Sequence, residues 1–269
     1  HLKAGNLVVI DEIQMIPELL HSVQRMIENK KLIFLLTGSS ARKLKRGQAN
    51  LLGGRAWELN LFPLTYAEIP NFDLEKFLFY GGIPRIYLSE DPQMELDSYF
   101  LTYIEQEIKI EANIRNLLPF HRFLKTASMQ NGELLNYANI ASDSGVPANT
   151  VKEYYTVLED SLIGHILEPW LESKKRKAIQ TSKFYFFDTG VCHFIQGTKT
   201  LERNSDLWGK AFEQFILMEL KKYNSSNKKE KNFTSGAVLI NKKSISSLIT
   251  TSRSKLSQQK EFLKSIWQD

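Results

Sequence analysis

Two adjacent carboxylates, Asp11 and Glu12, directly follow the apolar run Leu7-Val8-Val9-Ile10. A continuous apolar run with β-branched residues is typical of a strand buried on both faces of a parallel sheet. Ligands of such sheets bind beyond the carboxyl ends of the strands, where these two acids are expected. There Asp11 could hold a Mg²⁺ that bridges phosphate groups, and Glu12 could orient or deprotonate an attacking water. The alternative is a helix whose first turn carries acids because they suit the helix dipole.

The elements that follow favour the phosphate chemistry. Pro17 suits the start of a helix, and the apolar residues after it recur at helical spacing through Ile27. A second apolar strand is expected over residues 31–36, and it ends in Thr37-Gly38-Ser39-Ser40. These hydroxyls would stand beside the two carboxylates. The alternative for the serines is that one of them caps a helix starting near Ala41.

Four short motifs together resemble a known family. Prokaryotic AAA-superfamily ATPases fused to a C-terminal domain of unknown function carry them in the order seen here. The motifs are Asp-Glu-Ile-Gln at 11–14, Thr-Gly-Ser-Ser at 37–40, Leu-Gly-Gly-Arg at 52–55 and Phe-Pro-Leu at 62–64.

The resemblance implies a role for each candidate residue. Asp11 and Glu12 would form the Walker B pair that holds Mg²⁺ and activates water, with ATP as the nucleotide. Ser39 or Ser40 would be sensor 1, which donates a hydrogen bond to the γ-phosphate or the water. Arg55 would be an arginine finger or a phosphate-sensing arginine, a role that contributes on the order of 10³-fold to turnover. The alternative for Arg55 is a surface residue after a Gly-Gly turn.

Residues 71–119 are expected to form a helical lid or linker, again by this resemblance. The family carries the motif Tyr80-Gly81-Gly82-Ile83-Pro84 in its small lid region. Just before it, Thr65 and Glu68 have the spacing of a capping box and predict a helix start.

The order of expected elements over residues 120–190 predicts a winged helix. Helices are expected over 121–129, over 134–141 and from Pro147, with turns at Gly132 and Gly145, and two strands of a hairpin follow at 163–170 and 183–188. Such a module could bind DNA through the third helix and the cationic hairpin loop, or it could bind a protein partner or another subunit. The candidate DNA contacts are Asn149, Lys152, Lys174, Lys175, Arg176 and Lys177.

The helix expected at 207–216 is similar to the first helix of a restriction-nuclease-like domain, in which Glu213 would occupy the position of the helix glutamate. That architecture also needs an aspartate on a following strand. Because no aspartate lies between Asp206 and Asp269, we expect Glu213 to be a helix residue without catalytic partners.

The amino-acid composition of the chain changes after Tyr223. Residues 224–269 are rich in Ser, Lys, Asn and Thr and hold nine Lys and Arg against three Asp and Glu. We expect an aberrant segment read out of frame or from an interrupted gene, with a natural, partly disordered extension as the alternative. The basic pI near 9.0 therefore gives no argument for a nucleic-acid partner.

No Gly-x-x-x-x-Gly-Lys followed by Ser or Thr occurs in the chain, which begins at His1 rather than Met. That loop cradles the β and γ phosphates in P-loop enzymes. We therefore expect a fragment of an ATP-hydrolysing protein that binds ATP feebly, in a family whose sites often need the arginine of a neighbouring subunit and so a homo-oligomer. The alternative function is a non-hydrolysing winged-helix module that binds DNA or a protein.

The expected fold class is α/β. A partial AAA-type P-loop sheet (1–70) and the lid (71–119) precede the winged helix (120–190), a truncated α+β nuclease-like start (191–223) and the tail (224–269). No apolar run approaches the about 20 residues that span a bilayer, and the single Cys192 excludes an internal disulfide framework. The five histidines show no metal-ligand spacing. These features predict a cytoplasmic protein without a signal peptide or a membrane partner.

Overall fold

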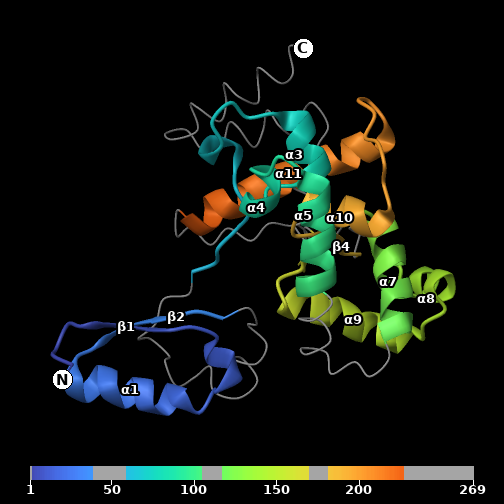
Figure 1. The fold of residues 1–269 in the computed structure, drawn as a ribbon. Coiled ribbons are helices and arrows are strands. Elements are labelled where there is room, and N and C mark those ends of the chain that lie inside the picture. The colour runs from blue at the N-terminus through green and yellow to red at the C-terminus, as the bar shows by residue number, and fades with distance from the viewer. Residues whose placement is uncertain (1, 39–58, 105–116, 170–180, 227–269) are drawn as a thin grey trace, which may run out of the picture.

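The chain folds into a small parallel sheet with one long helix, followed by a largely helical region (Figure 1). The computed structural model describes residues 2–38, 59–104, 117–169 and 181–226. Its first elements are β1 (Leu7–Ile10), a short 3₁₀ helix (Ile13–Met15), α1 (Leu19–Lys30) and β2 (Ile33–Leu36).

Among the described residues the sheet is covered on one face only, which corrects the prediction that β1 is buried on both faces. β1 and β2 pair in parallel, with Leu7 opposite Ile33 and Ile10 opposite Leu36. α1 packs beside β2 and buries Leu20 and Val23. On the other face the apolar side chains alternate outward and are about half exposed: Leu7 59%, Val9 58%, Ile33 56% and Leu35 49%.

The remaining elements are mostly short helices. A 3₁₀ turn (Tyr66–Glu68) begins at Thr65, where the predicted capping box is present: the Thr65 backbone N–H donates to the Glu68 carboxylate at 2.8 Å. The elements that follow are α3 (Leu74–Tyr80), α4 (Pro84–Tyr87), α5 (Pro92–Tyr99), a π-helical turn (Phe100–Ile104), α7 (Leu117–Met129), α8 (Tyr137–Ser144), α9 (Ala148–Asp160), β3 (Gly164–Leu167), β4 (Lys183–Phe186), α10 (Thr189–Gln196) and α11 (Asp206–Ser226).

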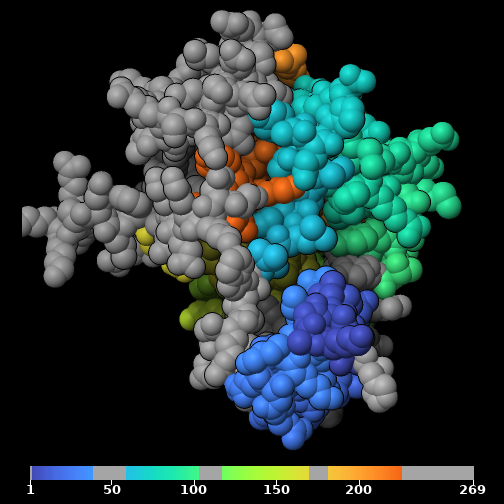
Figure 2. All heavy atoms as spheres, turned by 90° about the vertical axis from the view of Figure 1, so that its left-hand side faces the viewer, coloured from blue at the N-terminus to red at the C-terminus, as the bar shows by residue number. Residues whose placement is uncertain are grey.

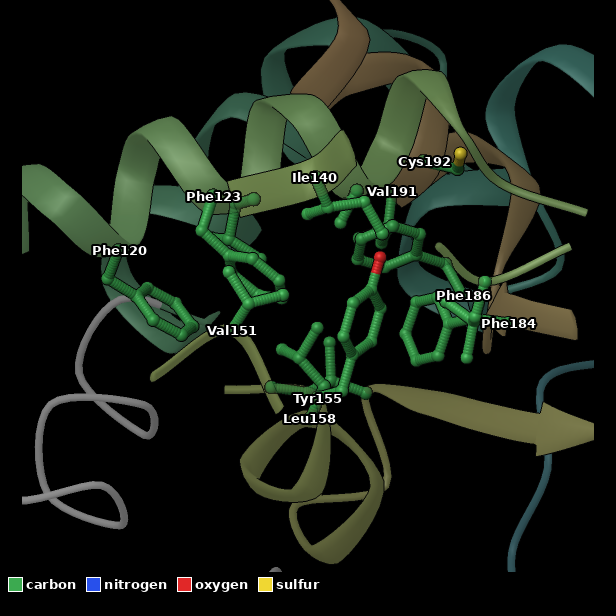
Figure 3. Packing of buried hydrophobic residues seen from close by; sticks show 14 of the residues in the cluster. Phe120, Phe123, Ile140, Val151, Tyr155, Leu158, Phe184, Phe186, Val191 and Cys192 are labelled. Atoms are coloured by element: carbon green, nitrogen blue, oxygen red, sulfur yellow. The ribbon is translucent and has the colours of Figure 1, made fainter. Parts of the chain in front are cut away.

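One aromatic core joins α7, α8, α9, β4 and α10 (Figure 3). Tyr155 lies at its centre, in edge-to-face contact with Phe123 at 4.9 Å and with Phe184 at 4.8 Å between ring centroids. Burial raises the pKa of the Tyr155 hydroxyl, so this residue stays neutral. The core holds the third helix, α9, firmly against the hairpin.

The hairpin is confirmed, but the second predicted helix starts later than expected. β3 and β4 are antiparallel, and the chain just before α8 runs along the other edge of β4. There the backbone N–H of Gly132 donates to Phe184 and that of Leu135 donates to Ser182, both at 2.8 Å. Backbone pairing therefore takes Leu135 away from the helix, and Asn136 caps α8 instead.

The two glycines of the Tyr80–Pro84 motif wrap around a buried carboxylate at the start of α10. The backbone N–H of Gly82 donates to Asp188 Oδ2 at 2.7 Å, and that of Val191 donates to Oδ1 at 3.1 Å. Gly81 has φ +79°, and a Cβ there would lie 1.9 Å from Asp188 Oδ1. Only glycine fits this approach, so the turn after α3 is fastened directly to α10.

α11 forms a second core with α3 and α4 (Figure 2, orange beside cyan). Phe215 stacks on Phe72 at 5.9 Å and meets Phe77 edge to face at 5.1 Å. Among the helices of the described ranges, none has the length and apolar character needed to cross a bilayer.

Candidate active site

Asp11 and Thr37 lie side by side beyond the carboxyl ends of the two parallel strands. The pairing continues past β1 and β2, because Thr37 N–H donates to the Ile10 carbonyl and Ile13 N–H donates to the Thr37 carbonyl, both at 3.0 Å. The Thr37 hydroxyl donates to Asp11 Oδ1, which also accepts the Glu12 N–H at 3.1 Å. The sequence reasoning assigned no role to Thr37, although it opens the Thr-Gly-Ser-Ser motif.

Glu12 is held by Gln14, a second residue whose role sequence reasoning missed. Glu12 adopts the left-handed conformation (φ 52°, ψ 41°), which is uncommon for a residue other than glycine. The buried Gln14 donates from Nε2 to the Glu12 carboxylate. A Cβ on Gly38 would lie 2.2 Å from Gln14 Oε1, so the glycine leaves room for this amide. The carboxylate orientation thus depends on both strand ends.

The carboxylate oxygens of Asp11 and Glu12 suit a hard cation. Both carboxylates are exposed rather than sealed among apolar neighbours, and Asp11 Oδ2 has no hydrogen-bond partner among the described residues. Carboxylate oxygens with water completing the shell are the ligands that Mg²⁺ takes in phosphate-transfer sites. Asp11 could therefore hold Mg²⁺ and Glu12 could face a water. The cradle for the phosphates has no counterpart in this sequence.

Three of the other predicted site residues, Ser39, Ser40 and Arg55, lie outside the described residues. So do the hairpin-loop cations, Lys174, Lys175, Arg176 and Lys177. Their roles stay predictions.

The two predicted contacts on α9 are solvent-exposed. Asn149 and Lys152 lie on the outward side of this helix, and the Lys152 ammonium lies over the Tyr137 ring of α8, 5.5 Å from its centroid. The surroundings carry more acids than cations, because residues 117–169 and 181–188 hold four Lys and Arg against seven Asp and Glu.

Among the described residues Glu213 has two polar partners, both from β4. Lys183 Nζ lies 2.9 Å from Glu213 Oε1, and the Tyr185 hydroxyl donates to the same oxygen. Burial, followed by the charge of Glu213, raises the pKa of Tyr185, so the hydroxyl remains a donor. The sequence Glu219-Leu220-Lys221 follows Glu213 within the same helix, α11. These contacts join α11 to the hairpin.

Comparisons with known protein families match two consecutive parts of the chain. Residues 1–70 match an AAA domain. Residues 71–202 match a domain of unknown function, DUF8612. The match indicates a P-loop NTPase of unknown role, and AAA domains typically use ATP and Mg²⁺. The broad resemblance expected from the four motifs is therefore confirmed. Asp11, Glu12 and Thr37 all lie within the AAA domain, whereas α11 lies beyond both matches although it completes the second core.

Two distant relatives are themselves uncharacterised. A protein of Haemophilus influenzae is 23% identical over 210 residues, which cover 71% of this chain and 52% of that protein. A protein of Methanocaldococcus jannaschii is 26% identical over 245 residues, which cover 79% of this chain and 52% of that protein. The chain thus spans about half the length of these curated relatives. No solved structure matches it.

Proposed function

We propose that this chain carries part of an ATP-binding and ATP-hydrolysing AAA protein, in which Asp11 holds Mg²⁺ and Glu12 orients or deprotonates the attacking water. The observation that carries the proposal is the pair of exposed carboxylates beyond β1, held by Thr37 and Gln14 from the two strand ends. Bound Mg²⁺ would neutralise charge on the phosphates. Thr37 fixes the Asp11 carboxylate, and Gln14 limits the rotation of Glu12.

The bare face of the sheet supports a larger nucleotide-binding core. An apolar face with side chains about half exposed, such as Leu7 and Ile33, is normally covered when helices lie on both sides of a parallel sheet. Two strands alone also make a marginal sheet. We propose that the phosphate loop comes from a segment outside this sequence. Ser39 or Ser40 would then serve as sensor 1, and Arg55 would act within or between subunits of a homo-oligomer.

The test compares residues 1–269 with a version extended upstream of His1 by the adjoining coding sequence. We expect the extended protein to bind a fluorescent ATP analogue with Mg²⁺ dependence and to hydrolyse ATP, and residues 1–269 to bind it feebly. Glu12→Gln should lower kcat about 100-fold or more while binding persists, and Asp11→Asn should remove the Mg²⁺ dependence. Glu18→Gln, an exposed acid of the same domain, is the matched control.

Two results would count against this proposal. Tight, Mg²⁺-dependent binding by residues 1–269 alone would contradict the inference that the phosphate cradle lies elsewhere. Hydrolysis undiminished by Glu12→Gln would remove that residue from the chemistry.

We also propose that residues 120–190 form a winged helix. The order of α7, α8, α9 and the β3–β4 hairpin supports this assignment, as does the pairing of residues 132–135 with β4. In this division residues 1–70 are the AAA part, 71–119 the lid, 191–223 a nuclease-like start and 224–269 an aberrant or disordered tail.

Residues 120–190 hold eight Lys and Arg against eight Asp and Glu, so the module has no net positive charge that would attract DNA, and we propose a protein partner. An electrophoretic mobility shift assay with duplex DNA at low ionic strength distinguishes DNA binding from protein binding. We expect no shift of duplex DNA, whereas a salt-sensitive shift that Lys152→Met weakens, with Lys125→Met on α7 as the control, would establish DNA binding instead.

A further inference from the structure

A surface cavity of about 340 Å³ opens between α3, α5 and α10, within the domain of unknown function. The three helices lie side by side (Figure 1). Small-molecule sites in proteins have volumes of roughly 300–1,000 Å³, so the cavity has room for a small ligand. None of its lining residues belongs to the AAA domain.

One wall of the cavity is aromatic. Phe79 and Tyr80 form an edge-to-face pair at 4.8 Å, and both line the cavity together with Phe194. Phe194 is fixed from behind by Phe100, with 4.9 Å between the ring centroids. Rigid aromatic faces of this kind favour a planar ring as the buried part of a ligand.

His193 adds a hydrogen-bond acceptor to that wall. Its side chain is only 4% exposed, and Nδ1 lies 3.4 Å from the Phe79 carbonyl, which can only accept. Burial lowers the pKa of His193, so the ring is neutral and its proton lies on Nδ1. Nε2 therefore keeps a free lone pair, and it meets no hydrogen-bond donor among the described residues. A ligand with an N–H or O–H group would satisfy this nitrogen.

The rim of the cavity carries one charge of each sign. Asp97 accepts from Gln93 Nε2 at 2.9 Å through Oδ1, which leaves Oδ2 available. Lys199 is exposed on the same rim just after α10. Within the described part of the chain, neither Asp97 nor Lys199 forms an ion pair. A ligand with both an ammonium and a carboxylate would pair with both.

We propose that this cavity binds a free aromatic α-amino acid whose ring carries a hydrogen-bond donor, with tryptophan as the best fit. The ring lies against Phe79, Tyr80 and Phe194 and donates to His193 Nε2. The α-ammonium faces Asp97, and the α-carboxylate faces Lys199. The site is independent of the proposed ATP chemistry, because no residue is shared.

Isothermal titration calorimetry of residues 1–269 tests the proposal with L-tryptophan and three analogues that each lack one group. Tryptamine lacks the carboxylate, indole-3-propionate lacks the ammonium, and 3-(1-naphthyl)-L-alanine lacks the ring N–H. We expect each analogue to bind about tenfold more weakly than L-tryptophan, because each leaves one charge-assisted hydrogen bond or the hydrogen bond to His193 unmade.

Two exposed substitutions assign the polar ends of the ligand. Lys199→Met should weaken L-tryptophan about tenfold but leave tryptamine unchanged, and Asp97→Asn should do the same with indole-3-propionate as the unchanged ligand. Lys125→Met is the matched control, an exposed lysine on α7 outside the cavity. Circular dichroism checks that the variants are folded.

The proposal is overturned if millimolar L-tryptophan gives no heat of binding. It is also overturned if all four compounds bind equally well, or if Lys199→Met and Lys125→Met have the same effect, because the three-point recognition would then be absent.

Discussion

Replacing Asp188 by asparagine tests how the turn after α3 is attached to α10. The Asp188 carboxylate is buried and accepts backbone N–H groups of Gly82 and Val191, and those of Ile83 and Gly190 also favour its charged form. Burial outweighs these donors and raises the pKa of Asp188 to about 6. The ionised carboxylate is therefore held at a cost in the folded protein.

The size and sign of that cost follow from the pKa. An aspartate in the unfolded chain has a pKa near 3.8, so the shift is about two units, which corresponds to about 3 kcal/mol. At a pH well below 3.8 the carboxyl is protonated in both states. As the pH rises, the unfolded chain loses its proton first, so the contribution of Asp188 to stability is lost progressively until the pH exceeds about 6.

Urea unfolding of the wild type and of Asp188→Asn, measured from about pH 4 to about pH 7, gives the difference in the free energy of unfolding. We expect this difference, wild type minus variant, to fall by about 2 kcal/mol across the range, because the amide does not titrate and the first part of the loss lies below about pH 4. Exposed Glu90→Gln is the control and should show no such trend. A difference that stays constant with pH would refute the argument that Asp188 ionises at a cost in the folded state.

Two further predictions concern packing. Gly81→Ala should destabilise the protein by about 3 kcal/mol or more, because its Cβ would meet Asp188 at positive φ, whereas Gly197→Ala, also at positive φ but with open space around it, should cost about 1 kcal/mol in urea unfolding. Equal losses would remove the steric argument. Glu213→Gln should lower the free energy of unfolding by about 2 kcal/mol, because Lys183, 15% exposed, loses its charged partner. An unchanged denaturation midpoint would mean that the contact adds no stability.

Local patterns in the sequence were enough for elements whose signals are short-range. The capping box at Thr65 and the strands β3 and β4 were predicted, since a capping box joins residues three positions apart and each strand follows from its own run of apolar residues. The start of α8 was not, because the backbone of Leu135 pairs with Ser182, forty-seven positions away. No periodicity encodes a bond of that range.

The candidate site also combines residues predicted from local sequence with residues whose roles only the tertiary structure showed. The motif alone placed Asp11 and Glu12 after a strand, because an apolar β-branched run followed by acids is a local feature. Thr37 and Gln14 gained roles only in three dimensions, since the first reaches Asp11 from the neighbouring strand and the second needs the space that Gly38 leaves.

The sequence by itself determined that an AAA domain precedes a largely helical region, because the four motifs and the helical spacing are properties of consecutive residues. Tertiary structure alone decided that one face of the sheet is left uncovered by the described part of the chain and that Gly81 closes onto Asp188. It also decided that His193, Asp97 and Lys199 line one cavity. These facts depend on which elements pack together, and packing brings together residues that are distant in the chain.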